Sequence, residues 1–274
     1  MPWPLILDNL LAAALTLCGL AALLLVLHLG ERAVGRQLAR RLGWRAVLLT
    51  GWLGVPVHEL GHLALARLFG HRILAWALFE PDPESGTLGY VRHAYSRRSL
   101  YQRLGSFFIA IAPLLSGGAA LVALLVWMLP GPALADLYLR ACRLGALDRL
   151  DALPGALHQL LAALGQAVWV DRTALLPLQL YLGVCVASHL APSAADCRNG
   201  LPGLLLVLFG GALACALAGL AGHSTRASLA LLPAVAALWL LVALFQLLYL
   251  GLVELLHGLG RRRGLTGSLR RGEK

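Results

Sequence analysis

The sequence predicts an all-α polytopic membrane protein with about six transmembrane helices. Hydrophobic residues make up 59% of the 274-residue chain, and charged residues only 13%. The apolar residues are gathered in blocks long enough to cross roughly 30 Å of hydrocarbon as helices that rise about 1.5 Å per residue. These blocks lack the alternation of polar and apolar residues that a membrane β-barrel requires. We therefore expect a single integral membrane domain over residues 1–274.

Six apolar blocks define the predicted spans. The first block has no basic start and is too long for a signal peptide, so we expect it to remain in the protein as a span. The blocks cover about residues 5–29, 46–69, 104–129, 174–195, 201–222 and 228–257. A short basic tail of about residues 260–274 follows the last block.

Three connecting segments have patterns of their own. Arginines at helical spacing predict a short interfacial helix over residues 31–45. Residues 73–79 and 87–91 are apolar and flank a turn rich in Pro, Asp and Gly. This pattern fits a small membrane-associated β-hairpin and an ordinary surface loop equally well. Leucines in the 131–173 segment favour an amphipathic helix lying at the membrane interface.

Charge and cysteine content narrow the possible partners and location. The formal net charge of +10 points to membrane topology and to the headgroups of a lipid bilayer. No basic stretch is interleaved with aromatic residues, so we expect no nucleic-acid partner. The five cysteines form no C-x-x-C pair and predict no disulfide framework. The basic residues are nearly all arginine, which indicates a GC-rich genome and favours a multi-pass protein of a bacterial inner membrane.

The second apolar block contains the sequence His58-Glu59-Leu60-Gly61-His62. Positions i and i+4 share one face of a helix, so the two histidines can present their imidazoles to one zinc ion. The glutamate between them is placed to take a proton from a zinc-bound water. An ionised Glu at bilayer depth costs roughly 2.5–3.5 kcal/mol. A metal centre would account for that buried charge. The alternative is a chance match of the motif on an ordinary helix.

A catalytic zinc ion needs a third protein ligand from elsewhere in the chain. The predicted topology puts the end of the 174–195 block on the same side of the membrane as the two histidines. Asp196 is the carboxylate near that end, and we predict it as the third ligand. Its alternative role is an N-cap for the following helix. His189 is the main rival ligand, its alternative being a core histidine, and Cys197 is a weaker rival.

The motif residues resemble those of the site-2 protease group of intramembrane zinc metalloproteases. The matching residues are His58, Glu59 and His62 in one membrane helix and Asp196 two spans later. The resemblance covers roughly residues 46–200, which would then form the catalytic core. It implies an enzyme that uses zinc and water to cut a transmembrane or membrane-bound protein substrate within the bilayer.

Some features match the family's pattern and others depart from it. Family members carry a membrane-associated β-hairpin, and residues 73–91 are similar to it in placement. Ala195-Asp196-Cys197 stands where the family has Leu-Asp-Gly, and Ser188 stands where the family has an Asn. The chain also lacks a PDZ insertion. The resemblance is therefore to a divergent branch of the group.

The expected function is that of an intramembrane zinc metalloendopeptidase. The resemblance implies that zinc is held by His58, His62 and Asp196 and that Glu59 is the general base. Two other classes of function remain open, a proteolytically idle membrane scaffold or regulator and a metal transporter or sensor. A transporter typically distributes polar residues along several spans, whereas here they are concentrated at one place. The sequence carries no indication of the oligomeric state.

Overall fold

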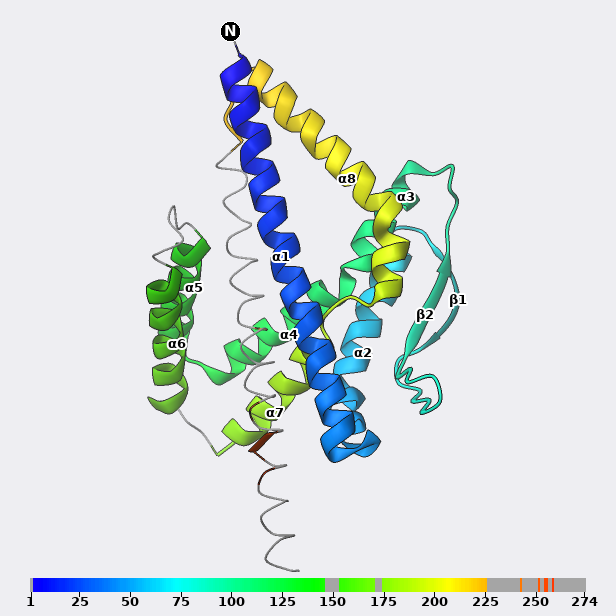
Figure 1. Ribbon diagram of the computed structural model, residues 1–274, viewed down its shortest axis with the longest axis vertical. Helices are drawn as coiled ribbons and strands as arrows, with labels where there is room; N and C mark the ends of the chain where they lie inside the picture. Colours follow the sequence, from blue (N-terminus) through cyan, green and yellow to red (C-terminus); the bar gives the residue numbers. More distant parts are fainter. Residues whose placement is uncertain are drawn as a thin grey trace, which may run out of the picture.

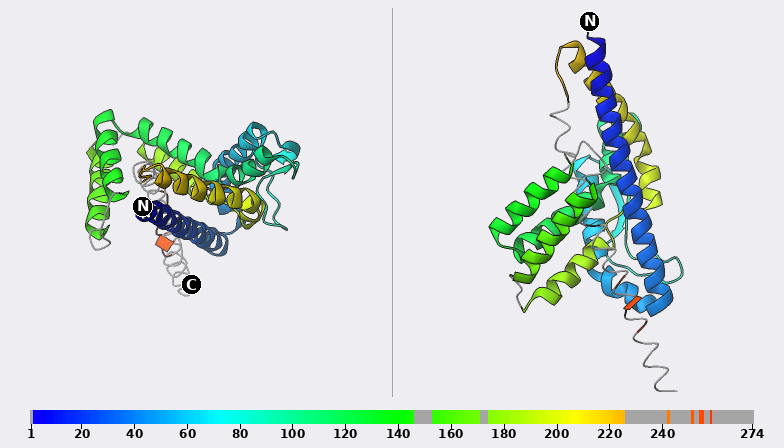
Figure 2. Two further views of the ribbon diagram at one scale, coloured as in Figure 1. Left: turned by 90° about the horizontal axis from the view of Figure 1, so that it is seen from above. Right: turned by 60° about the vertical axis from the view of Figure 1, so that its left-hand side comes forward.

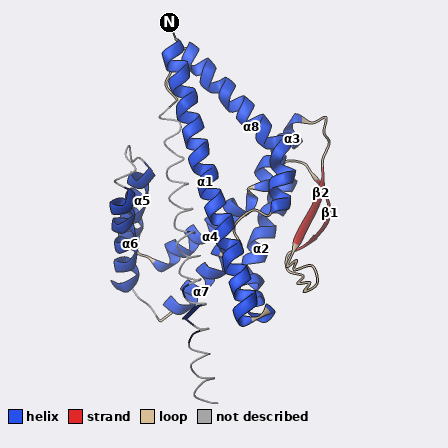
Figure 3. Ribbon diagram, in the orientation of Figure 1, coloured by secondary structure: helices blue, strands red, loops and turns tan. Residues whose placement is uncertain are grey.

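The computed structural model describes residues 2–145, 153–170 and 174–225, together with single positions at 242, 251, 254, 255 and 258. In this part the chain is mostly helical, with one two-stranded sheet at its edge (Figure 3). The helices are α1 (Trp3–Leu42), α2 (Trp44–Leu68), α3 (Leu100–Ala110), α4 (Ala112–Met128), α5 (Gly131–Gly145), α6 (Leu153–Val170), α7 (Leu176–Ala187) and α8 (Ala194–Leu220). The strands are β1 (Arg72–Ala77) and β2 (Tyr90–Ala94).

Helices α1 and α8 meet near the N-terminus and diverge from there (Figure 1). Asn9 of α1 is fully buried and joins the two helices at this point. Its side-chain amide donates to the carbonyl oxygens of Cys215, at 3.3 Å, and His223, at 3.0 Å. Its Oδ1 accepts the backbone N–H of Thr225 at 3.0 Å. From this junction α8 leads towards α3 and the strands, and α1 leads towards α2.

Helix α1 is longer than the first predicted span. Arg32, Arg36, Arg40 and Arg41 continue α1 and Arg45 lies in α2, so the prediction of a separate interfacial helix over residues 31–45 was wrong. Arg and Leu are good helix formers, and the helix continues until a residue that cannot stay in it. That residue is Gly43, whose φ of +82° suits glycine and ends α1 just before α2 begins.

Fewer helices than six qualify as membrane spans in the described part of the chain. Helices α1 and α8 are long and apolar enough, and α3 with α4 would make a third if this pair, bent by 51°, is one span. Helix α2 has polar motif residues in its second half and is not among them. Helix α7 has only 12 residues, so the predicted 174–195 span is too long. The predicted span at 228–257 lies outside the described residues, apart from a few single positions.

A β-hairpin follows α2, as one of the two interpretations of this segment predicted. Strands β1 and β2 pair antiparallel, with Trp76 opposite Val91 and a register shift between Ile73 and Ala75. The second strand begins three residues later than predicted, at Tyr90. The turn between the strands is organised by Asp82, which accepts hydrogen bonds from the hydroxyl and N–H of Ser85 and the N–H of Glu84.

The hydrophobic core lies where α4, α7 and the middle of α1 meet. Its fully buried side chains include Leu27 of α1, Leu114 and Leu121 of α4, and Leu190 just after α7. Helices α5 and α6, in the segment predicted to hold an amphipathic helix, form a pair that stands to one side of the others (Figure 2, left). Val57 of α2, next to His58, packs against this core.

Candidate metal centre

Both motif histidines of α2 direct their Nδ1 atoms at backbone carbonyl oxygens. The Nδ1 of His58 lies 2.8 Å from the carbonyl oxygen of His189, and the Nδ1 of His62 lies 2.8 Å from that of Ile109. A carbonyl oxygen only accepts hydrogen bonds, so each Nδ1 carries the proton and donates. Each Nε2 is left with a lone pair, and the two Nε2 atoms are 3.1 Å apart. Backbone carbonyls of this kind are the usual outer partners of metal-binding histidines.

Asp196 reaches the same point from the first turn of α8. Its Oδ1 lies 3.5 Å from the Nε2 of His62, and its Oδ2 lies 3.9 Å from the Nε2 of His58. One ligand atom from each of the three residues lies within 4.8 Å of the other two. The three predicted metal ligands thus come together in the fold, and the group could hold a metal ion.

The arrangement of these donor atoms favours a bound cation. Two unprotonated Nε2 atoms at 3.1 Å repel each other unless a metal ion or a proton is shared between them. Nitrogens bound at about 2.0–2.1 Å to one tetrahedral zinc ion are separated by about 3.3 Å, close to the observed spacing. Two imidazoles and one carboxylate are also a donor set found in catalytic zinc sites, which keep a fourth position open for water.

Asp196 also stabilises the start of α8, but not as the N-cap that its alternative role predicted. Ser193 is the N-cap, and its hydroxyl accepts the N–H of Asp196 at 3.1 Å. In return, the Oδ2 of Asp196 accepts the N–H of Ser193 at 2.7 Å, which completes a capping box. Asp196 is therefore the third residue of the helix and not its N-cap. The cap holds one carboxylate oxygen, and Oδ1 remains directed at His62.

The segment between α7 and α8 is held in place by α1. The Oε2 of Glu31 accepts the backbone N–H of Ala191 at 2.6 Å. The Nδ1 of His28, one turn earlier on α1, lies 3.2 Å from the carbonyl oxygen of Pro192. Two side chains of α1 thus bind the backbone just before Ser193. The metal centre takes its ligands from α2 and α8, and α1 supports the segment that leads into α8.

Glycines let α2 approach its neighbours closely at the motif. A Cβ on Gly61 would lie 2.5 Å from the hydroxyl of Ser116 and 2.9 Å from the carbonyl oxygen of Ala112, both in α4. A Cβ on Gly54 would overlap the carbonyl oxygen of Cys185 in α7. Because contacts this short are not tolerated by a real Cβ, the sequence needs glycine at both positions. The close packing brings the Ile109 and His189 carbonyls within reach of the histidines.

Glu59 is buried next to the cluster, whereas the rings or thiols of the rival ligands lie outside it. Glu59 is 7% exposed, and in the described residues it forms no ion pair with an Arg or Lys. His189, the rival ligand, takes part through its backbone carbonyl, because its ring is outside the group of three. The Nε2 of that ring is buried and has no hydrogen-bond partner in the described structure. Cys197, the weaker rival, is exposed and also outside the group.

A second histidine pair lies at the base of the hairpin, close to the cluster. The Nδ1 atoms of His71 and His93 are 2.9 Å apart, and the Nε2 of His71 donates to the carbonyl oxygen of Gln102 at 2.8 Å. Burial, and then the nearby His71, lower the pKa of His93 to about 4. The His93 ring is therefore neutral at pH 7. Through His71, the pair connects the hairpin to α3.

Sequence reasoning missed several supporting groups of the cluster. The capping box could have been found, because Ser193-x-x-Asp196 has the spacing that such a box requires. Glu31 also left a signal, as an acidic residue directly after a long apolar stretch. The carbonyls of Ile109 and His189 left none, because every residue has a carbonyl and only the fold selects which one faces a histidine.

Comparison of the chain with protein-family models, with curated proteins and with solved structures finds no match. The geometry of the cluster and its neighbours therefore carries the functional proposal.

Proposed function

We propose that this protein is an intramembrane zinc metalloendopeptidase that hydrolyses a peptide bond of a transmembrane or membrane-bound protein. The observation that carries the proposal is the cluster itself. Two imidazole lone pairs converge at 3.1 Å, a carboxylate oxygen joins them at 3.5 Å, and a buried glutamate is next in the chain to one of them. The same residues carry the resemblance to the site-2 protease group, of which this chain would be a divergent branch.

Zinc suits these ligands, and His58, His62 and Asp196 would hold it. Imidazole binds several transition metals, but zinc has no redox chemistry and accepts two nitrogens and one oxygen in a tetrahedral site. When bound there, the ion supplies Lewis acidity that lowers the pKa of a water molecule to about 7 and polarises a carbonyl group.

The residues of the chain supply the remaining chemistry. Glu59, one residue from His58, accepts the proton of the attacking water and returns it to the leaving amine. The carbonyls of His189 and Ile109 keep the protons of both imidazoles on Nδ1 and the lone pairs on Nε2. The cap at Ser193 fixes the Asp196 carboxylate before any substrate arrives. These groups preorganise the centre.

The proposal is tested with purified full-length protein in detergent and a panel of fluorescent single-span peptides. Glu59→Gln keeps the size of the side chain but removes the base. We expect peptide cleavage to fall by about 10²–10⁴-fold while zinc content, measured by mass spectrometry, stays near one ion per chain. His58→Ala is expected to lose both zinc and cleavage.

The outcomes separate the three classes of function. Cleavage that survives Glu59→Gln contradicts the assignment of the base. Zinc bound by the native protein without cleavage of any peptide favours a transporter or sensor, and its uptake into liposomes would show it. The absence of bound zinc, with no cleavage, leaves a scaffold. Leu60→Ala, an exposed change within the motif, is the matched control and keeps both activities.

A further inference from the structure

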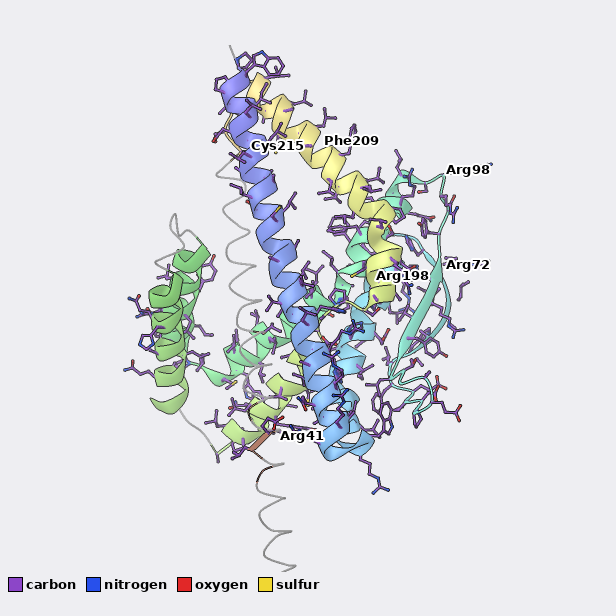
Figure 4. The ribbon with its side chains drawn as sticks, viewed as in Figure 1. Arg41, Arg72, Arg98, Arg198, Phe209 and Cys215 are labelled. Atoms are coloured by element: carbon purple, nitrogen blue, oxygen red, sulfur yellow. The ribbon has the colours of Figure 1, made fainter. Side chains whose placement is uncertain are left out.

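A basic cavity lies near the metal centre, although none of the three proposed ligands lines it. It has a volume of about 610 Å³ and lies between β2 and the first turns of α8. Polar and charged side chains dominate its lining, and they are Arg92, His93, Tyr95, Arg97, Arg198 and Asn199. Figure 4 shows Arg198 on the part of α8 that faces the strands. The cavity is not used by the hydrolytic chemistry described above.

The cavity is positively charged and has no internal counter-charge. No carboxylate lines it, and none of its three arginines forms a salt bridge in the part of the chain that the structure describes. Arg92 stacks on the ring of Tyr90 at 5.0 Å, which leaves the N–H groups at the edge of its guanidinium available. Because His93 is neutral at pH 7, the charge comes from the guanidinium groups.

The cavity and the metal centre share one helix. Arg198 and Asn199 follow the proposed ligand Asp196 by two and three residues, which is less than one turn of α8. On the other wall, His93 is close enough to Asp196 and His62 to be affected by their charge. A peptide that fills the cavity would therefore lie only a few residues from the bond at the hydrolytic site.

The wall formed by β2 favours a peptide as the occupant. Five consecutive residues, Val91 to Tyr95, line the cavity along the strand. Strand β2 pairs with β1 on one side only within the described sheet, so its other edge has free backbone groups. An extended peptide matches such a wall in length and shape. A guanidinium pairs with a carboxylate through two parallel hydrogen bonds, which favours an acidic side chain on that peptide.

We propose that this cavity, which we name the arginine pocket, binds an Asp or Glu side chain of the peptide substrate, a few residues from the bond that is cut. The inference rests on the proposed peptidase function and adds to it a class of substrate. The protein would thus select membrane-bound substrates that carry an acidic residue at a fixed distance from the cleavage site, where the segment leaves the apolar part of the membrane.

The test measures binding, so it does not depend on hydrolysis. Short apolar peptides with blocked ends and a neutral dye carry one Glu at each position in turn, and matched peptides carry Gln. Their affinity for the full-length Glu59→Gln protein in a neutral detergent is measured by fluorescence anisotropy. We expect one position at which Glu binds at least about tenfold more tightly than Gln, as charge-assisted hydrogen bonds predict.

Single substitutions then locate the preference. Arg198→Gln should reduce the Glu preference to near one while leaving the affinity for the Gln peptide and the zinc content unchanged, and these last two readouts also show that the variant is folded. If that variant does not fold, Arg97→Gln is used in its place. The matched control is Arg98→Gln, because Arg98 is exposed on the loop before α3, outside the arginine pocket (Figure 4).

Three other outcomes overturn the proposal. Equal binding of Glu and Gln peptides shows that the arginine pocket has no anion preference. Equal loss in the Arg98→Gln control shows an effect of overall charge. A preference that disappears when phosphatidylglycerol is added to the neutral detergent shows that a lipid phosphate occupies the arginine pocket. If the native protein cuts no peptide yet the Glu preference maps to Arg198, the peptidase function fails and the anion site stands.

Discussion

The two halves of the metal centre are built in different ways. The α2 half contributes two ligands from one helix, and their four-residue spacing alone places them on the same face. The α8 half contributes one ligand, whose position depends on a capping box and on contacts from α1. The first half is local in sequence, whereas Ala191 and Glu31, which support the second, are 160 residues apart. Substitutions in the two halves should therefore affect zinc binding and stability to different extents.

The strongest effect is expected from the local half. His62→Ala removes one of two imidazoles, together with the hydrogen bond between its Nδ1 and the Ile109 carbonyl. Zinc content should fall from about one ion per chain towards zero, and peptide cleavage with it. Mass spectrometry of the purified protein measures the zinc content, and the peptide assay measures cleavage. Retention of full zinc would show that α2 is not the metal-binding half.

The next effect concerns the approach of α7 to α2. Gly54→Ala places a Cβ against the Cys185 carbonyl, and backbone cannot move aside as a side chain can. We expect a loss of about 1–3 kcal/mol of stability, measured by reversible unfolding in mixed micelles. Gly35→Ala is the matched control, because Gly35 is also helical and a Cβ there has nothing within 4 Å. The control should be neutral or slightly stabilising; equal losses would refute the packing explanation.

A smaller effect should follow from loosening the α8 half. Glu31→Ala removes the acceptor of the Ala191 N–H but touches no ligand. Zinc affinity should weaken by about 10–100-fold, as is typical for groups that position ligands, while secondary structure measured by circular dichroism is unchanged. Glu31→Gln retains an acceptor oxygen and should recover most of the affinity. Arg32→Ala, an exposed neighbour on α1, is the control, and an equal effect there would point to α1 as a whole.

The smallest effect is expected at the cap itself. Ser193→Ala removes the hydroxyl that accepts the Asp196 N–H, but the carboxylate of Asp196 can still accept the N–H of residue 193. Loss of an N-cap costs about 1 kcal/mol of stability. We expect a loss of that size in unfolding, together with a zinc affinity that changes by less than that of Glu31→Ala. A larger loss of zinc would make the cap, and not α1, the main support of Asp196.

Sequence patterns predicted the helical class, the His58 and His62 pair and the candidacy of Asp196, because each depends on composition or on spacing within one helix. They also kept open the hairpin that the structure shows. Five of the six predicted spans fall in the described part of the chain, where two helices, or three with the bent pair, qualify. Apolar composition measures how well a segment suits a membrane, but it does not show where a helix ends. The helices end at Gly43 and after Ala187.

By itself the sequence determined which residues can bind a metal, since two imidazoles four residues apart face the same way on any helix. Only the tertiary structure decided that Asp196 completes the group while the rival His189 contributes a carbonyl. It also decided that α1 holds the segment in front of Asp196 and that three arginines line a pocket beside it. The physical reason is distance along the chain. His58 and His189 are 131 residues apart, and only the packing of the helices brings such residues together.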